Sequence, residues 1–209
     1  ELKMDIYHLY FEALRAAHTG QAMDLYGLDY LMDDVVENDK GKLLVQRVKA
    51  IHRLKSAAPA SYLARIGAML GGGRKEQIEG LANYFTALGL SFQIIDDTLN
   101  LKGFKDGLKT KGEDITAGKI TYPMARAFSM LSKRARRELY SIIQSKTEDI
   151  EVIARAIALM DSCQAIDLAE KEARTSLEAA WRRLDPLVED SMVKINLRAF
   201  SWYVLDRTY

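Results

Sequence analysis

The stretch FQIIDDTLNLKGFKDGLKTKGEDITAGKITYP, residues 92–123, contains the pattern from which the fold and the candidate site are inferred. Apolar residues lie on both sides of the paired aspartates Asp96 and Asp97, as is typical of a largely buried helix. A lysine-rich segment broken by glycines follows, and it predicts a loop. The stretch therefore predicts a packed helix that delivers acidic groups next to a basic loop.

The helical pattern continues on both sides of this stretch. Apolar residues recur at three-to-four spacing through most of the 209 residues, and only three prolines interrupt them. We expect helices near residues 2–17, 19–29, 41–70, 74–101, 120–131, 133–145, 148–161, 163–182 and 186–207. The segment GGGR, residues 71–74, predicts a helix-breaking turn. The expected fold class is all-α.

Composition limits the function classes. The chain has 48% apolar residues, which suffices for one sizeable packed domain. Its 30 basic and 29 acidic residues nearly cancel, so net charge does not indicate binding to nucleic acid or to an anionic membrane. No segment approaches the roughly 18 consecutive apolar residues of a spanning helix. The single cysteine, Cys163, fits a reducing compartment, and we expect a cytoplasmic protein.

The paired aspartates predict a metal site. On a helix Asp96 shares a face with Gln93 and Asn100, whereas Asp97 is turned away by about 100°. Ionised carboxylates beside an apolar run are costly unless they are paired or bind a cation. Mg²⁺ suits such a site, because it takes oxygen ligands and bridges one or two carboxylates to substrate phosphates. The alternative is an exposed acidic patch at a helix end.

The loop supplies charges complementary to a phosphate. Its lysines are Lys102, Lys105, Lys109, Lys111 and Lys119, and its glycines allow the backbone to approach a ligand closely. A solvated lysine loop is the alternative interpretation, and we favour it for Lys102 and Lys105. The aspartates and the remaining lysines together predict a substrate that carries phosphate.

Three motifs in order resemble a known family. FQIIDDTLNL and KGEDITAGKITYP resemble the second aspartate-rich motif and following lysine loop of trans-isoprenyl diphosphate synthases. EALRAAHTGQAMDLY, residues 12–26, is similar to the family's His-x-Gly-Gln helix. RVKAIHRLKSAAPASYLARIGAML, residues 47–70, is similar to its Lys-Thr helix, with Lys55 and Ser56 at the matching positions. The motifs span most of the chain.

The resemblance implies an isoprenoid synthase-type helical bundle and a magnesium-dependent prenyltransferase. In the family an allylic diphosphate ionises, isopentenyl diphosphate attacks the cation, and a proton is lost. The expected product is geranylgeranyl diphosphate or geranylfarnesyl diphosphate; the residues that set product length are not visible in this sequence.

The resemblance also implies roles for individual residues. Asp96 would bind Mg²⁺ directly, and Asp97 would bind it through water or lie beside Lys111. Asn100 stands where many members have a third aspartate, which lowers the charge of the motif. Asp114 would orient the lysine of the loop.

Further residues are implied to act on the substrates. Lys55 and Lys119 would contact the allylic diphosphate, while Ser56 and Gln93 would place oxygens near the nascent cation. The family's lysine after the second motif corresponds to Lys111, or to Lys109 because the loop length varies. Gln21 and Asp24 could form a buried polar contact near the site.

The resemblance also concerns domain organisation. GLDYLMDDVVEND, HRLKSAAPAS and VLDRTY look most like the prenyltransferase domain of fungal bifunctional chimeric terpene synthases, in which a terpene cyclase domain comes first. Residues 1–209 would then form the C-terminal part of one prenyltransferase domain, and the first aspartate-rich motif would lie upstream. On this interpretation the fragment alone is inactive. We expect DDVVEND, residues 33–39, to be an interhelical loop rather than a replacement metal site.

Two other functions remain as alternatives. A noncatalytic, modulatory subunit of a prenyltransferase assembly is less favoured because Asp96, Asp97, Lys55 and Lys119 are all present. A class I terpene cyclase needs an Asn-x-x-x-Ser-x-x-x-Glu motif, which the sequence lacks. Long amphipathic helices and the resemblance suggest a homo-oligomer, at least a dimer. His8, His18 and His52 lack mutual ligand spacing and are expected to be structural.

Overall fold

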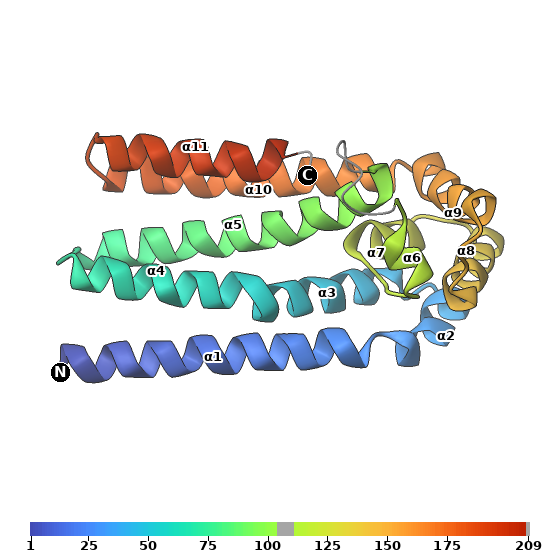
Figure 1. The fold of residues 1–209 in the computed structure, drawn as a ribbon, viewed down its shortest axis with the longest axis horizontal. Coiled ribbons are helices and arrows are strands. Elements are labelled where there is room, and N and C mark those ends of the chain that lie inside the picture. Colours follow the sequence, from blue (N-terminus) through green and yellow to red (C-terminus); the bar gives the residue numbers. More distant parts are fainter. Residues whose placement is uncertain (104–110, 208–209) are drawn as a thin grey trace. The chain divides into compact units, whose positions relative to one another are not determined.

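The computed structural model describes residues 1–103 and 111–207, and every regular element in these two ranges is helical. The all-α prediction is confirmed (Figure 1). The helices are α1 (Leu2–Tyr26), α2 (Asp29–Asn38), α3 (Gly41–His52), α4 (Ala58–Leu70), α5 (Lys75–Lys102), α6 (Glu113–Thr116), α7 (Tyr122–Phe128), α8 (Lys133–Ser145), α9 (Ile150–Ser162), α10 (Ala165–Leu184) and α11 (Met192–Asp206). A π-helical segment, Arg53–Ala57, joins α3 to α4, and a 3₁₀ turn, Asp185–Leu187, follows α10.

Several predicted boundaries are wrong. The segment at residues 33–39, which we expected to be a loop, lies mostly in α2. The reason is its apolar spacing: Met32, Val35 and Val36 lie at i, i+3 and i+4, and all three are buried. The predicted break between residues 17 and 19 is absent, because α1 continues to Tyr26.

Other differences concern short elements. The helix predicted over residues 41–70 contains the π-helical segment Arg53–Ala57, and the four-residue helix α6 was not predicted. The helix predicted over 120–131 is shorter, since α7 spans Tyr122–Phe128. Side-chain caps explain where some helices start: the side chains of Ser132, Asp149 and Ser191 accept backbone N–H groups at the starts of α8, α9 and α11.

The chain forms two compact units, and the first comprises Glu1–Leu25, Ala50–Gln93 and Ala173–Arg207. In it α4 and α5 run antiparallel, joined by the predicted glycine turn, where Gly72 has a φ of 71° (Figure 1). Tyr84 is fully buried, and its hydroxyl donates to the carbonyl of Leu197 at 3.1 Å. Ser91 donates to the carbonyl of Ala173 at 2.9 Å. These bonds join α5 to α10 and α11.

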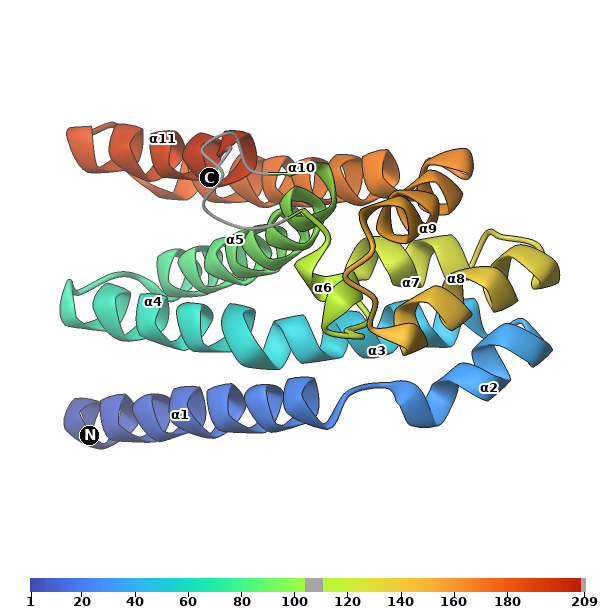
Figure 2. The same cartoon turned by 45° about the vertical axis from the view of Figure 1, so that its right-hand side comes forward.

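The second unit comprises Tyr26–Lys49 and Ile94–Glu172. Its core includes five fully buried residues: Leu101, Ile115, Tyr122, Met124 and Phe128. In it α8 and α9 lie next to each other, as Figure 2 shows. Charged pairs join α2 to α8, with Arg137 and Lys133 both contacting the carboxylate of Glu37 at 2.6–2.7 Å.

Glu37 makes the stability of the second unit dependent on pH. Hydrogen bonds from Arg137 and Lys133 lower the pKa of its carboxyl to about 2. A carboxyl whose pKa is lowered by folding contributes stability above its unfolded pKa, and loses it as the pH falls through the folded pKa. The contribution should therefore disappear between pH 4.5 and about 2.

When the pH is lowered from 7 to 3, we expect the melting temperature of the Glu37→Gln variant to fall by less than that of the wild type. Glu148→Gln is the control, because Glu148 is an exposed carboxylate of the same unit. Thermal unfolding at both pH values measures the effect. An identical pH dependence of Glu37→Gln and the wild type would exclude this contribution.

Candidate functional site

The two paired aspartates of α5 differ in their surroundings. Asp96 is half-buried, whereas Asp97 is only 5% exposed. Asp97 Oδ2 accepts the backbone N–H of Tyr122 at 2.8 Å. Tyr122 is the first residue of α7, and the preceding Thr121 makes no side-chain cap. Asp97 therefore caps α7 from another helix.

Asn100, one turn further along α5, contacts the segment that follows the loop. Its side chain is buried, and its Oδ1 accepts the backbone N–H of Asp114 at 3.2 Å. Its carbonyl oxygen accepts the backbone N–H of Gly112 at 2.8 Å. Gly112 has a φ of 84°, a conformation that favours glycine. An amide at position 100 therefore has a structural function.

Asp114 lies in α6, and its carbonyl oxygen accepts the backbone N–H of Lys119 at 2.8 Å. This bond fixes the backbone at Lys119, whose side chain is half-buried. The orientation of a lysine by the Asp114 carboxylate stays a prediction.

A partly buried polar cluster at α7 was not predicted from the sequence. The hydroxyl of Tyr122 donates to Glu172 Oε2 at 2.5 Å, and Arg126 forms an ion pair with the same carboxylate. Burial raises the pKa of Tyr122, and the hydrogen bond to Glu172 raises it further. Burial also raises the pKa of Glu172, but the hydrogen bonds from Arg126 and Tyr122 outweigh it, so the net pKa is lowered. Tyr122 is thus a neutral phenol held at both its backbone and its hydroxyl.

Lys55 and Ser56 lie on the π-helical segment Arg53–Ala57 of the first unit. π-Helical turns are rare and occur frequently at functional sites. Two glycines allow other helices to approach this segment. A Cβ added to Gly20 of α1 would lie 2.6 Å from Leu54 C and Lys55 Cα, and one added to Gly89 of α5 would lie 2.7 Å from Ala57 Cα.

Lys55 is paired with an acid on α1. Its Nζ donates to Asp24 Oδ2 at 2.6 Å, and both side chains are mostly buried, at 28% and 14% exposed. Asp24 thus forms a mostly buried polar contact, and its partner here is Lys55, while Gln21 is exposed. Asp24 therefore holds the ammonium of Lys55 in place.

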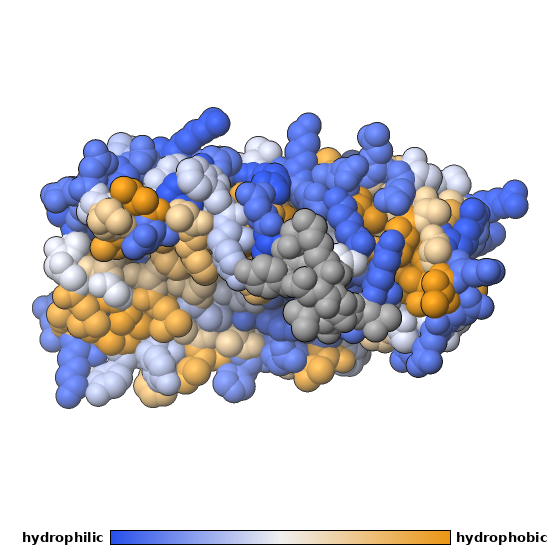
Figure 3. All heavy atoms as spheres, turned by 45° about the horizontal axis from the view of Figure 1, so that its top comes forward, coloured by the Kyte–Doolittle hydropathy of each residue, from blue (hydrophilic) through white to orange (hydrophobic). Residues whose placement is uncertain are grey.

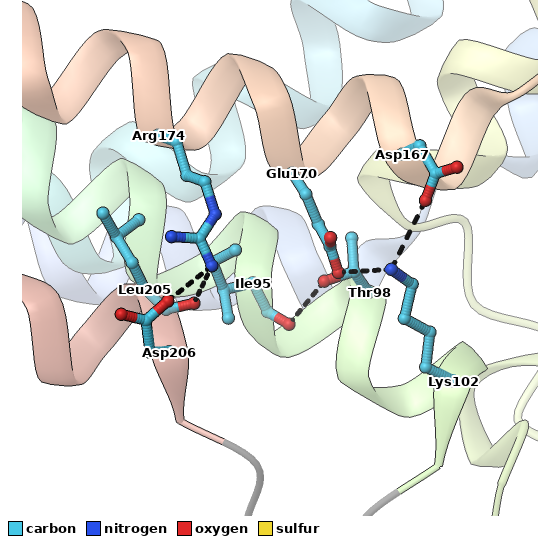
Figure 4. A network of polar contacts seen from close by, with 8 residues as sticks. All are labelled: Ile95, Thr98, Lys102, Asp167, Glu170, Arg174, Leu205 and Asp206. Atoms are coloured by element: carbon cyan, nitrogen blue, oxygen red, sulfur yellow. Dashed lines mark hydrogen bonds and ion pairs between the residues drawn. The ribbon is translucent and has the colours of Figure 1, made fainter.

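The lysines of the loop fall into three groups. Lys102, which we expected to be a solvated loop lysine, is the last residue of α5 and forms ion pairs with Glu170 at 2.8 Å and Asp167 at 3.4 Å (Figure 4). Lys111 is exposed and Lys119 half-buried. Lys105 and Lys109 lie outside the described residues.

The predicted site residues belong to both units. Lys55, Ser56 and Gln93 lie in the first unit, while Asp96, Asp97, Lys111 and Lys119 lie in the second. Gln93 and Asp96 are three residues apart on the continuous helix α5, as the sequence predicted. Their assembly into one site stays a prediction.

The acidic groups that the structure describes could bind magnesium only if water and the substrate phosphates supply the other ligands. In residues 1–103 and 111–207 no group of three His, Cys, Asp or Glu side chains could hold a metal ion. Asp34 contacts Asn38 and Lys40, which lower the pKa of its carboxyl. His52 is buried, whereas His8 and His18 are exposed. Asp96 supplies one carboxylate, and Mg²⁺ bound in this way takes its other ligands from water and phosphate.

Comparisons with known proteins agree on one family. The family model of polyprenyl synthetase matches residues 1–160. The short chain isoprenyl diphosphate synthase of Methanothermobacter thermautotrophicus is 31% identical over 191 residues, which are 91% of this chain and 55% of that protein. The chloroplastic geranylgeranyl pyrophosphate synthase 11 of Arabidopsis thaliana is 33% identical over 147 residues, 66% of this chain and 39% of that protein. The chain spans about half or less of these relatives.

Solved structures show the same fold. Geranylgeranyl pyrophosphate synthetase from Pyrococcus horikoshii superposes with a TM-score of 0.84 at 22% identity, covering 99% of this chain and 60% of that one. Geranylgeranyl pyrophosphate synthase from Corynebacterium glutamicum, complexed with calcium and isoprenyl diphosphate, gives a TM-score of 0.78 at 25% identity, covering 98% and 60%.

Proposed function

Because the chain belongs to the polyprenyl synthetase family, we propose that its protein is a magnesium-dependent prenyltransferase that joins isopentenyl diphosphate to an allylic diphosphate. One observation carries this proposal. Helix α5 places the half-buried carboxylate of Asp96 beside Asp97, which in turn holds the segment that contains Lys119. An acid and a lysine on a braced backbone suit a diphosphate bound through a metal ion.

The chemistry explains the residue types. The C–O bond of the allylic diphosphate breaks, and its electron pair leaves with the pyrophosphate. The double bond of isopentenyl diphosphate then forms the new C–C bond, and a proton is lost. Magnesium, when bound, would neutralise charge that develops on the pyrophosphate. Lys55 and Lys119 would do the same through their ammonium groups, and Ser56 and Gln93 would turn oxygens toward the cation.

The product and the cellular context are also part of the proposal. We expect geranylgeranyl diphosphate first and geranylfarnesyl diphosphate second, made in the cytoplasm. The similarity of residues 27–39, 52–61 and 204–209 to fungal chimeric enzymes supports a bifunctional protein with a terpene cyclase domain. In the part of the chain that the structure describes, no helix is long and apolar enough to cross a membrane.

Exposed apolar side chains support assembly into a homo-oligomer. On α1, Met4, Tyr7 and Phe11 are 68%, 48% and 64% exposed, and their spacing places them along one face. The face of the molecule displayed in Figure 3 also has hydrophobic areas between hydrophilic residues. Exposed apolar patches commonly mark contacts between proteins.

The direct test is product analysis. The full-length protein is incubated with isopentenyl diphosphate and, in turn, dimethylallyl, geranyl and farnesyl diphosphate, with magnesium or with a chelator. We expect elongated diphosphates only with magnesium, and mass spectrometry gives their length. Absence of any elongation by the protein without a partner would favour the modulatory subunit.

Lys55→Ala tests the lysine of the π-helical segment. We expect the KM for the allylic diphosphate to rise by about 10- to 100-fold, because a charge-assisted hydrogen bond to the substrate contributes about 1.5–3 kcal/mol. Arg53→Ala is the control, since Arg53 is an exposed cation of the same segment. Steady-state kinetics and thermal unfolding separate binding from folding, and unchanged kinetics would remove Lys55 from the site.

A further inference from the structure

We propose that Asp97 is a positioning residue: it holds the start of α7, and with it the turn that carries Lys119, instead of binding magnesium. The inference rests on the proposed function, because it assigns a role within that site. It differs from both roles expected for Asp97 from the sequence, which were binding magnesium through water and lying beside Lys111.

The two neighbouring aspartates differ in direction and in burial. Adjacent residues on a helix point about 100° apart, so the two carboxylates diverge. Asp97 is 5% exposed, and its Oδ2 already accepts the Tyr122 N–H at 2.8 Å. Asp96 is the more exposed of the two. The buried carboxylate of Asp97 therefore stabilises the backbone at the start of α7.

The segment from Gly112 to Tyr122 is hydrogen-bonded to α5 at both ends. Asn100 accepts the N–H groups of Gly112 and Asp114, and Asp97 accepts that of Tyr122. Between these ties the Lys119 N–H donates to the Asp114 carbonyl at 2.8 Å. One helix thus fixes the backbone from which the Lys119 side chain extends.

The side chain of Tyr122 is itself held in place. Its ring is fully buried, and its hydroxyl donates to Glu172, which is paired with Arg126. Because the side chain is fixed in this way, α7 is held at Tyr122 independently of the bond to Asp97. Loss of the Asp97 cap would release the turn before α7 while leaving α7 packed.

Three variants separate positioning from metal binding. Asp97→Asn keeps an oxygen that can accept the Tyr122 N–H but removes the charge, and Asp97→Ala removes both. Thr98→Val is the matched control, because Thr98 is equally buried on α5 and its hydroxyl donates only locally, to Ile95 O at 2.9 Å (Figure 4). Each full-length protein is measured by amide hydrogen exchange at Tyr122 and by steady-state kinetics.

In Asp97→Ala we expect the Tyr122 amide to exchange about tenfold faster or more, because its charged acceptor is lost. Turnover should fall at least about tenfold and the KM for the allylic diphosphate should rise, because Lys119 is no longer held in position. Asp97→Asn should stay within about threefold of wild type in both readouts. Thr98→Val should leave both unchanged, and none of the three should alter the magnesium concentration for half-maximal rate.

Two results would overturn the proposal. One is a tenfold or greater increase in the magnesium requirement of Asp97→Asn with the Tyr122 amide still protected, which would make Asp97 a metal ligand. The other is an exchange rate at Tyr122 that does not respond to Asp97→Ala. If Asp97→Ala does not fold, Asp97→Asn alone decides between the outcomes. A wild type without prenyltransferase activity would contradict the proposed function, while the exchange rates would still report on the cap.

Discussion

Asp96→Ala is expected to reduce prenyl transfer by at least two to three powers of ten while the protein remains folded. Removal of one group that stabilises developing charge typically costs this much, and Asp96 is the carboxylate of the aspartate pair that we propose to bind the metal. Folding should persist because Asp96 is half-buried and alanine is a good helix former. The measurement is turnover at saturating substrates, with circular dichroism to verify the helices.

Asp167→Ala provides the control for the loss of a carboxylate. Asp167 lies in the same unit, is 80% exposed, and contacts Lys102 at 3.4 Å. Surface ion pairs of this kind contribute little, so activity and stability should be close to those of the wild type. Near-normal turnover of Asp96→Ala would show that Asp96 does not bind the metal.

The second large effect is expected on stability, from Gly20→Ala. The added Cβ would lie 2.6 Å from the backbone of the π-helical segment, and backbone atoms cannot move aside as a flexible side chain can. Overpacking typically costs 1–3 kcal/mol, and a clash with backbone should reach about 3 kcal/mol or more. The substitution should also displace Lys55, because the clash is at Leu54 and Lys55 themselves.

Gly67→Ala is the matched control in the same unit. Gly67 lies inside α4, and a Cβ there would meet nothing within 4 Å. Alanine is favoured over glycine in a helix interior by about 1 kcal/mol, so this variant should be slightly stabilised. Denaturant unfolding gives both values. Equal stability of Gly20→Ala and the wild type would mean that α1 does not pack closely on the π-helical segment.

The long helices could be predicted because their sequence pattern is local. Apolar spacing predicted α5 to within a residue at each end, and the triple glycine predicted the turn before it. The same reasoning failed at α2, where acidic residues obscured the buried row of Met32, Val35 and Val36. A short helix with many charged residues on its exposed side has a composition similar to that of a loop.

The contacts around the site depend on residues far apart in sequence. Asp24 meets Lys55 across 31 positions, and Tyr122 meets Glu172 across 50. The spacing of residues within one helix cannot predict such pairs. The spacing of Asp24 from Gly20 on α1, one turn apart, offered a hint, since the glycine permits the close approach that brings the lysine within reach.

The central claim is that Asp96 binds a diphosphate through magnesium, and calorimetric titration of the full-length protein with inorganic pyrophosphate tests it most directly. We predict binding that requires magnesium, weakens at least about tenfold in Asp96→Ala, and is unchanged in Asp167→Ala. Pyrophosphate binding of the same affinity with and without magnesium, or the same in Asp96→Ala as in the wild type, would contradict the claim.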